Sequence, residues 1–305
     1  MKNVTSLTLA ERMRRALPGM SPGERRIVRL CLALNAPEEL ATVAIMAEAA
    51  GVSPPTVLRA LDKIGFDHFG AFREVAMAEI AARHQSAFAQ MRRGTASGAD
   101  PLAAMLKALG DAVRDTFDRL DQGELANAID LLADPRLRQI FTGGRFSHSL
   151  AEQLHAHVNL MRPGTELLSY SGHGRTSRLV DIGRSHVVTL FDFRRYERET
   201  VELAHGAKRK RAKIVLITDQ WMSPIADWAD AVLVAEVQSA SPFDTMVPGL
   251  ALVETMISLL HARLSGATER LAQFETASGR FEWVGFDTPA QDATLSAGEF
   301  GDHAE

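Results

Sequence analysis

The stretch Val188–Thr200, VTLFDFRRYERET, begins as an apolar run and ends in closely spaced charged side chains. The apolar run is typical of a buried β-strand, and open α/β sheets bind their ligands at strand ends. The charged residues that follow it are Asp192, Arg194, Arg195, Glu197, Arg198 and Glu199. Because guanidinium groups bind carboxylates and phosphates through paired hydrogen bonds, the stretch is either an anion-binding loop or the solvated start of a helix.

A second set of candidate residues lies near the N-terminus, in TVAIMAEAAGVSPPTVLRALDKIG. Two helices joined by AGVS have helix-turn-helix spacing, with Gly51 at the turn and Ser53 as the cap of the second helix. Hydroxyl and guanidinium groups on the first turns of such a helix suit DNA phosphates and guanine edges. The predicted DNA-binding residues are Ser53, Pro55, Thr56, Arg59 and Lys63, with Arg25 and Arg26 of the preceding helix. The spacing alone also fits a plain three-helix bundle.

A helical domain must position these residues. Ser21-Pro22-Gly23-Glu24 has the form of a capping box, and Pro22 suits the first helical position. We expect five helices, over residues 7–17, 22–34, 42–50, 53–64 and 69–84, in an all-α domain spanning residues 1–85. Residues 86–101 contain RRGTASGADP, which is typical of a linker.

The pattern changes at Leu102, from which apolar strand-like runs alternate with helical segments. The expected strands are LRQIFTGG, TELLSY, SHVVTLFDF, KIVLITD and AVLVAEV. Such alternation predicts an α/β domain over residues 102–265, a three-layer sandwich around a five-stranded parallel sheet. A closing helix around residues 246–260 is apolar nearly all round, so we expect part of it in a subunit interface. Residues 266–305 are expected to be a loosely ordered tail.

The composition fits a soluble globular protein, with 46% apolar and 24% charged residues among 305. The one cysteine, Cys31, excludes an intramolecular disulfide, and neither a signal peptide nor a membrane-spanning run is visible. We therefore expect a cytoplasmic protein with no membrane contact. The first 93 residues carry a net charge of +4 and the remainder −8, which favours an anionic partner for the N-terminal part alone.

Residues 7–80 resemble the N-terminal domain of RpiR/MurR-type transcriptional regulators. The resemblance rests on MSPGERRIVRLCLAL and on AGVSPPTVLRALDKIGFDHFGAFREV. Pro54 and Pro55 stand where small or polar residues are commoner in that family. The resemblance implies binding to double-stranded DNA at a pseudo-palindromic operator by a homodimer or homotetramer, and family habit favours repression.

The same family carries a C-terminal sugar isomerase (SIS) domain of flavodoxin-like fold, which residues 105–264 resemble, including SPIADWADAVL. SIS domains typically hold a phosphorylated sugar between a Gly-x-Gly-x-Ser loop and a Ser-x-Ser-Gly-x-Thr loop. The first loop aligns with Gly143–Ser147, where Arg145 replaces the second glycine. The second loop aligns with Asp192–Glu197 and keeps none of its defining residues. The predicted effector-binding residues are Gly143, Arg145, Ser147, Asp192, Arg194 and Arg195.

These residues predict a transcriptional regulator, not an enzyme, whose SIS domain senses a small anionic metabolite, a sugar phosphate or a carboxylate. Acidic neighbours could instead neutralise the arginines in a structural loop or subunit contact, leaving the SIS domain to oligomerise only. A sugar-phosphate isomerase is the remaining alternative. We expect no cofactor and no metal site, because His148, His155 and His157 lack the spacing and companions of a metal-binding set.

Overall fold

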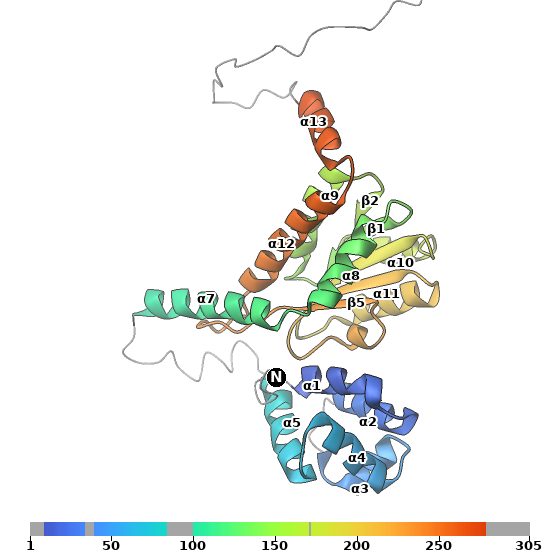
Figure 1. Ribbon diagram of the computed structural model, residues 1–305, viewed down its shortest axis with the longest axis vertical. Helices are drawn as coiled ribbons and strands as arrows, with labels where there is room; N and C mark the ends of the chain where they lie inside the picture. Colours follow the sequence, from blue (N-terminus) through green and yellow to red (C-terminus); the bar gives the residue numbers. More distant parts are fainter. Residues whose placement is uncertain (1–8, 34–39, 84–99, 171, 279–305) are drawn as a thin grey trace, which may run out of the picture.

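The computed structural model describes residues 9–33, 40–83, 100–170 and 172–278, which form an N-terminal helical unit and a C-terminal α/β domain (Figure 1). The helical unit contains α1 (Leu9–Ala16), the 3-10 turn η2 (Leu17–Gly19), α2 (Pro22–Ala33), α3 (Val43–Ala49), α4 (Pro54–Ile64) and α5 (Phe69–Arg83). The apolar faces of these helices share one core, which includes Met13, Ile27, Met46, Leu61 and Phe72. The predicted all-α N-terminal unit is confirmed.

Local signals in the sequence set the ends of these helices. The Ser21 amide donates to Glu24 Oε2 at 2.7 Å and the Glu24 amide donates to Ser21 Oγ at 3.3 Å, which completes the predicted capping box. Thr42 caps α3 by accepting from the Ile45 amide at 3.2 Å. Gly51 adopts a φ of 62° in the turn between α3 and α4, a conformation that favours glycine.

The α/β domain is built on a single sheet in which every neighbouring pair of strands is parallel. The strands are β1 (Arg138–Gly143), β2 (Thr165–Leu167), β3 (His186–Phe191), β4 (Lys213–Thr218) and β5 (Ala231–Val234). Their spatial order is β2-β1-β3-β4-β5, the flavodoxin-like order. The predicted five-stranded parallel sheet is therefore confirmed.

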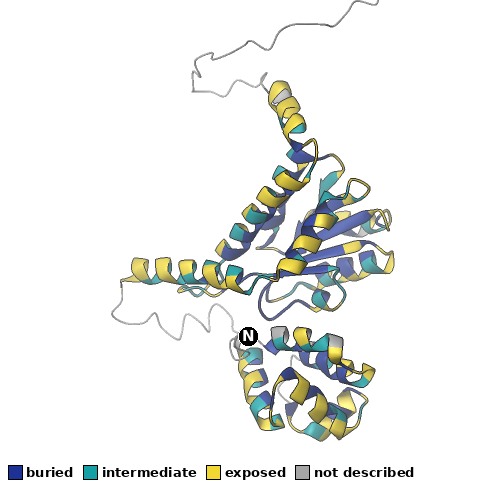
Figure 2. Cartoon of the chain, in the orientation of Figure 1, coloured by how far each residue is buried: buried dark blue, intermediate teal, exposed yellow. Residues whose placement is uncertain are grey.

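Helices cover both faces of the sheet, and the strands between them are buried (Figure 2). The helices are α7 (Pro101–Arg119), α8 (Gln122–Ala133), α9 (His148–Met161), α10 (His173–Leu179), α11 (Arg198–Arg209), α12 (Val247–Arg263) and α13 (Ala267–Ser278), with the 3-10 turn η4 (Pro224–Asp227). One core joins α8, α9 and α12 to Phe141, Val187 and Phe191, and the other joins α11 to Val188 and Leu216. These layers make the three-layer sandwich that the strand and helix pattern predicts.

The chain departs from the sequence-based expectation at its C-terminal side. The composition from Gly266 predicts a loose tail, whereas α13 follows directly, because Gly266 turns at a φ of 86° and Ala267 is buried in the core. Residues 279–305 of the predicted tail lie outside the described residues. Most of the predicted linker, residues 86–99, lies outside the described residues; Asp100 caps α7 by accepting from the Leu102 amide at 3.0 Å. No single described helix is long and apolar enough to cross a membrane, and α12 with α13 passes only as a pair bent by 103°.

Candidate ligand site and nucleic-acid interface

The sheet has its topological switch point between β1 and β3, and ligands of open α/β sheets bind outside the strand ends there. Gly143, at the end of β1, pairs with Phe191, at the end of β3. The Gly144 amide donates to the Phe191 carbonyl at 3.1 Å. The fold therefore brings together the two loops that the sequence singles out, residues 144–147 and 192–197.

Hydrogen bonds of the Ser147 hydroxyl hold the first loop, residues 144–147, in its conformation. The Ser147 hydroxyl donates to the Phe191 carbonyl at 2.7 Å and accepts from the Gly144 amide at 3.1 Å, and the side chain is buried. A Cβ at Gly143 would lie 2.9 Å from backbone atoms of Ser147, so only glycine fits there. The predicted ligand residues Gly143 and Ser147 thus hold the loop in shape.

Asp192 opens the second loop as a buried carboxyl group. Its Oδ2 accepts from the Ser223 hydroxyl at 2.5 Å, and its Oδ1 accepts from the Glu197 amide at 3.4 Å. Burial raises the pKa of Asp192 to about 7, against the lowering effect of the Ser223 hydrogen bond. The carboxyl faces the protein interior, where it positions the loop from β4 to η4.

Arg194 forms a buried ion pair with Asp244, a residue from the loop between β5 and α12. Arg194 Nε donates to Asp244 Oδ2 at 2.6 Å, and Nη2 donates to Oδ1 of the same carboxylate. The guanidinium carbon lies 5.2 Å from the centroid of the Trp221 ring. The expectation that acidic neighbours neutralise the arginines is correct in kind for Arg194, but the partner lies 50 residues away in the sequence.

A second buried carboxyl, Asp219, supports the backbone of Arg194. It accepts from the Arg194 amide, from the Tyr196 hydroxyl at 2.8 Å and from the Trp221 amide at 3.0 Å. Burial raises its pKa to about 6, although these hydrogen bonds act in the opposite direction. Arg194 is therefore fixed through its main chain as well as its side chain.

Arg145 and Arg195 are the predicted arginines that remain exposed at this edge. Arg195 adopts a φ of 67°, which is uncommon outside glycine. The Arg145 amide donates to Glu197 Oε1 at 2.9 Å, so a carboxylate from the second loop already touches the first. These two guanidiniums are the predicted groups most accessible to an anion from solvent.

Arg175, on α10, is a buried residue at this edge that the sequence analysis misses. Its guanidinium donates to the carbonyls of Ser169 and Gly143 at 2.8 and 2.7 Å, and to the hydroxyls of Thr142 and Thr200 at 2.8 and 3.1 Å. Burial lowers the pKa of its guanidinium. The SGHGRTS segment gives no local signal for this role, because the four partners come from three other parts of the chain.

In the helical unit, one face of α4 is exposed at its N-terminal half. Ser53 Oγ lies 2.9 Å from Thr56 Oγ1, and Arg59 Nη2 donates to Thr56 Oγ1 at 3.2 Å, so the three predicted contact residues form one polar cluster. Ser53, Pro55 and Arg59 are exposed, while the opposite side of α4 is buried. The hydroxyls and the guanidinium therefore point away from the core.

The other predicted DNA-binding residues are tied to the protein. Lys63 Nζ donates to Glu24 Oε2 at 2.8 Å and to the Gly19 carbonyl at 2.9 Å. Arg25 donates to the Met20 carbonyl at 3.1 Å, and Arg26 donates to the Gly51 carbonyl at 3.2 Å. Both arginines are exposed, and the bond from Arg26 holds the α3–α4 turn against α2.

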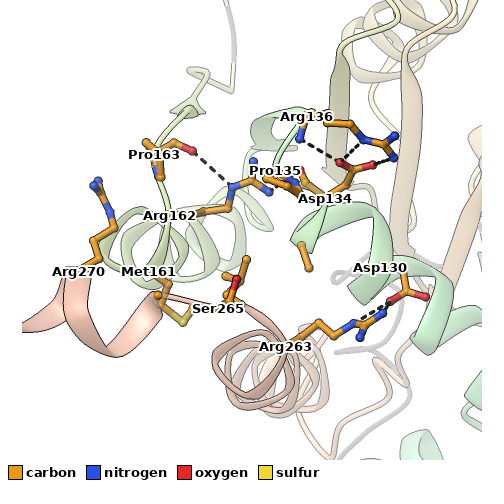
Figure 3. A pocket seen from close by; sticks show the side chains of 13 residues that line it. Asp130, Asp134, Pro135, Arg136, Met161, Arg162, Pro163, Arg263, Ser265 and Arg270 are labelled. Atoms are coloured by element: carbon orange, nitrogen blue, oxygen red, sulfur yellow. Dashed lines mark hydrogen bonds and ion pairs between the residues drawn. The ribbon is translucent and has the colours of Figure 1, made fainter.

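A separate cavity of about 640 Å³ lies near the amino-terminal ends of β1 and β2, between the C-terminal ends of α8, α9 and α12 (Figure 3). Four arginines line it, and each has a partner. Arg136 pairs with Asp134 and Arg263 with Asp130, while Arg162 and Arg270 donate to backbone carbonyls. Two of these arginines therefore form ion pairs at the surface, and the other two bind backbone carbonyls near the ends of helices. Within the described ranges, no group of three His, Cys, Asp or Glu side chains could hold a metal ion.

The C-terminal domain is a SIS domain: residues 131–259 match the SIS family model, and the sheet order agrees with it. The sugar isomerase domain of an RpiR transcription factor from Sphaerobacter thermophilus aligns with a TM-score of 0.54 and 22% identity, covering 59% of this chain and 98% of that one. The Vibrio vulnificus NanR protein, complexed with ManNAc-6P, aligns with a TM-score of 0.53 and 16% identity, covering 90% of this chain and 100% of that one.

These identities show a shared fold alone. The NanR alignment spans 90% of this chain and so takes in most of the helical unit as well as the SIS domain. A Methanococcus jannaschii protein whose structure was taken to infer a 3-hexulose-6-phosphate isomerase aligns with a TM-score of 0.44 and 13% identity, covering 55% and 95% of the two chains, which does not bear on activity. No curated protein sequence matches the chain significantly.

Proposed function

We propose that this chain is a DNA-binding transcriptional regulator whose SIS domain responds to a small anionic metabolite. The observation that carries the DNA-binding part is the outward cluster of Ser53, Thr56 and Arg59 on the N-terminal half of α4. A recognition helix contacts base edges with that part of its surface. The architecture shared with NanR, a helical unit ahead of a SIS domain, supports the same reading.

Selection of bound duplexes from a random DNA library, followed by anisotropy titration, tests this part. Arg59→Ala should weaken binding to the selected site by about 1–3 kcal/mol if Arg59 contacts a base. If it contacts a phosphate, the loss should be equal on all sequences and the salt slope should fall by about one. The matched control is Arg198→Ala, which removes the same charge from an exposed site on α11. Failure to select any sequence would reject DNA recognition.

The ligand part of the proposal places an anion at the carboxyl ends of β1 and β3. Arg145 and Arg195 are exposed there, and the N-terminal end of α9 adds a positive dipole. NanR is complexed with ManNAc-6P, a sugar phosphate. In this chain the loop after β3 has Asp192, Arg194 and Arg195 in place of hydroxyl residues, which argues against an isomerase-like phosphate cradle.

Thermal shift against sugar phosphates, sugar acids and dicarboxylates tests the ligand part, since a ligand that binds the folded state raises its melting temperature. Neutral sugars should give no shift. Arg195→Ala should abolish the shift while leaving DNA binding by the ligand-free protein unchanged, because only the coupling is lost. If no anion in the library raises the melting temperature, the result would favour a SIS domain that serves assembly alone.

We further propose that the protein is a homo-oligomer. Leu102 and Leu106, near the start of α7, are 76% and 72% exposed, and Phe243 is 65% exposed. Large exposed apolar side chains, here two on α7 and one on the loop between β5 and α12, are typical of a subunit contact. A two-fold dimer would present two copies of α4 to a pseudo-palindromic site.

A further inference from the structure

Arg194 presents a planar, two-donor fork to a carboxylate, and in this structure the carboxylate belongs to the chain itself. Nε donates to Asp244 Oδ2 at 2.6 Å while Nη2 donates to Oδ1, the paired geometry by which arginine recognises any carboxylate. We infer that Arg194 is the carboxylate-recognition residue of the SIS site, that Asp244 is its internal occupant, and that release of Asp244 loosens the β5–α12 loop and α7. This inference deepens the proposed ligand function and rests on it.

The two partners differ in how firmly they are held. The Arg194 side chain is 4% exposed, its amide is bound by Asp219, and its guanidinium faces the Trp221 ring. The Asp244 side chain is 22% exposed and stands on residues 238–246, a segment without helix or strand. The guanidinium therefore keeps its place when the carboxylate leaves, and the carboxylate is the partner that solvent reaches.

The surroundings favour a carboxylate over a phosphate in this position. Asp192 lies in the same loop as Arg194, and Asp219, after β4, accepts from the Arg194 amide; in their ionised forms these carboxyls repel a phosphate dianion more strongly than a carboxylate monoanion. The Ser147 hydroxyl, which a phosphate oxygen would need, already donates to the Phe191 carbonyl. The site therefore selects a small molecule that carries a monocarboxylate, such as a sugar acid.

The loop that carries Asp244 also holds α7, the helix that follows residues 84–99 and so leads from the helical unit (Figure 1). The Glu236 amide donates to Thr116 Oγ1 at 2.9 Å, and Arg119 pairs with Glu236 at 3.0 Å. Farther along the loop, Ser239 Oγ lies 3.9 Å from the sulfur of Met105. Loss of the Asp244 tether thus reaches the segment that connects the ligand site to the proposed DNA-binding unit.

The test uses the full chain with Asp244→Ala and acetate as the probe. Acetate should restore the melting temperature of this variant in a saturable way that sodium chloride of equal ionic strength does not reproduce. In Asp244→Ala, the backbone amides of residues 236–246 and of α7 should exchange hydrogen at least about tenfold faster than in the parent, because the tether is lost. Acetate fills the fork without restoring this tether. The faster exchange should persist at saturating acetate.

Two control variants sharpen the result. Asp130→Ala exposes the fork of Arg263 at the surface and should show no acetate dependence. Asp244→Ala combined with Arg194→Lys keeps the positive charge, removes the fork and should lose the acetate response. No saturable acetate effect on Asp244→Ala would overturn the recognition claim, and unchanged exchange in α7 would overturn the coupling claim. Neither readout involves DNA, so failure of the proposed DNA binding would remain distinguishable from both.

Discussion

Asp192 is a buried residue of the SIS domain whose carboxyl group changes its charge near neutral pH. Burial raises its pKa to about 7, whereas in the unfolded chain an aspartate ionises near 3.8. The folded state therefore holds the proton more tightly, and the stability that this group contributes is lost as pH rises from about 4 through 7. Urea unfolding should show a parent protein that is more stable at pH 5.5 than at pH 8.

Asp192→Asn should flatten this dependence, because asparagine can still accept from Ser223 and carries no charge. A smaller dependence should remain in the variant, since the pKa of Asp219 is raised to about 6 and acts in the same direction. Identical pH dependence in the parent and the variant would show that Asp192 ionises at its ordinary pKa. Asp230→Asn serves as a control: the pKa of Asp230 is lowered, so this substitution should not flatten the loss of stability with rising pH.

Arg175 fixes the carboxyl end of β1 through four hydrogen bonds from a buried guanidinium. Arg175→Met fills a similar volume but leaves the Gly143 and Ser169 carbonyls without this donor. We expect a loss of about 2–4 kcal/mol in the free energy of unfolding, since buried unsatisfied acceptors each cost about 1–3 kcal/mol. Chemical denaturation measures the loss, and a change below about 0.5 kcal/mol, typical of a surface site, would contradict the assignment.

The sequence places the charged residues at the carboxyl ends of β1 and β3 but shows only part of the contacts made there. The charged stretch does follow β3 at the strand end beside β1, because an apolar run followed by polar residues is a local pattern, and its ligand role stays a prediction. Arg175 and Asp244 are missed because each acts through partners far along the chain, and Ser147 is better described as a loop fastener. Local spacing cannot show which of several carboxylates reaches a given guanidinium.

Among the elements, α2 and α4 are joined by the pair of Glu24 and Lys63. The Lys63 hydrogen bond, with those from Ser21, lowers the pKa of Glu24 to about 2. Its stabilising effect is present above the unfolded pKa of 4.5 and is lost as pH falls through about 2. Glu24→Gln should therefore destabilise the helical unit at pH 7 and weaken DNA binding, because Lys63 lies on α4.

Ser21→Ala separates the two roles of this carboxylate. It removes the cap and should cost about 1 kcal/mol, while leaving the Lys63 pair in place. Thermal unfolding of both variants at pH 7 and pH 3 is the measurement. Glu24→Gln should cost more than Ser21→Ala at pH 7, and the gap should narrow at pH 3. An equal cost at both pH values would show that the ion pair contributes nothing.

Element-level prediction succeeds where the signal is periodic. The alternation of apolar runs and helices predicts the five-stranded parallel sheet, and the capping box predicts the start of α2. The expectation of a loose tail is wrong for residues 267–278, because α13 has few large apolar residues and is anchored by a buried Ala267 and by Arg270 on the Asn159 carbonyl. Tertiary contacts of this kind leave little trace in composition.

For the whole molecule, the expected subunit interface on α12 stays a prediction, and α7 offers a second candidate surface. The helix is apolar nearly all round, yet Leu252, Val253, Met256 and Leu260 are fully buried within its own domain. It packs against α7, α8 and α9, while Val247, Leu250 and Leu259 of the same helix stay exposed. Leu102 and Leu106 on α7 are more exposed than any of these, so the assembly prediction is tested there first.

Leu102→Glu combined with Leu106→Glu should convert the proposed dimer to a monomer, because charged side chains would be buried in the contact at a cost of several kcal/mol. Sedimentation velocity at micromolar concentration is the measurement. The control is Val180→Glu, at an apolar position on the SIS domain that is 71% exposed. Since two linked α4 helices bind two half-sites with much greater affinity than one, the double variant should also lose most of its affinity for a palindromic duplex while keeping weak half-site binding. A parent protein that sediments as a monomer would reject the proposed dimer, and a double variant that stays dimeric would place the assembly surface elsewhere.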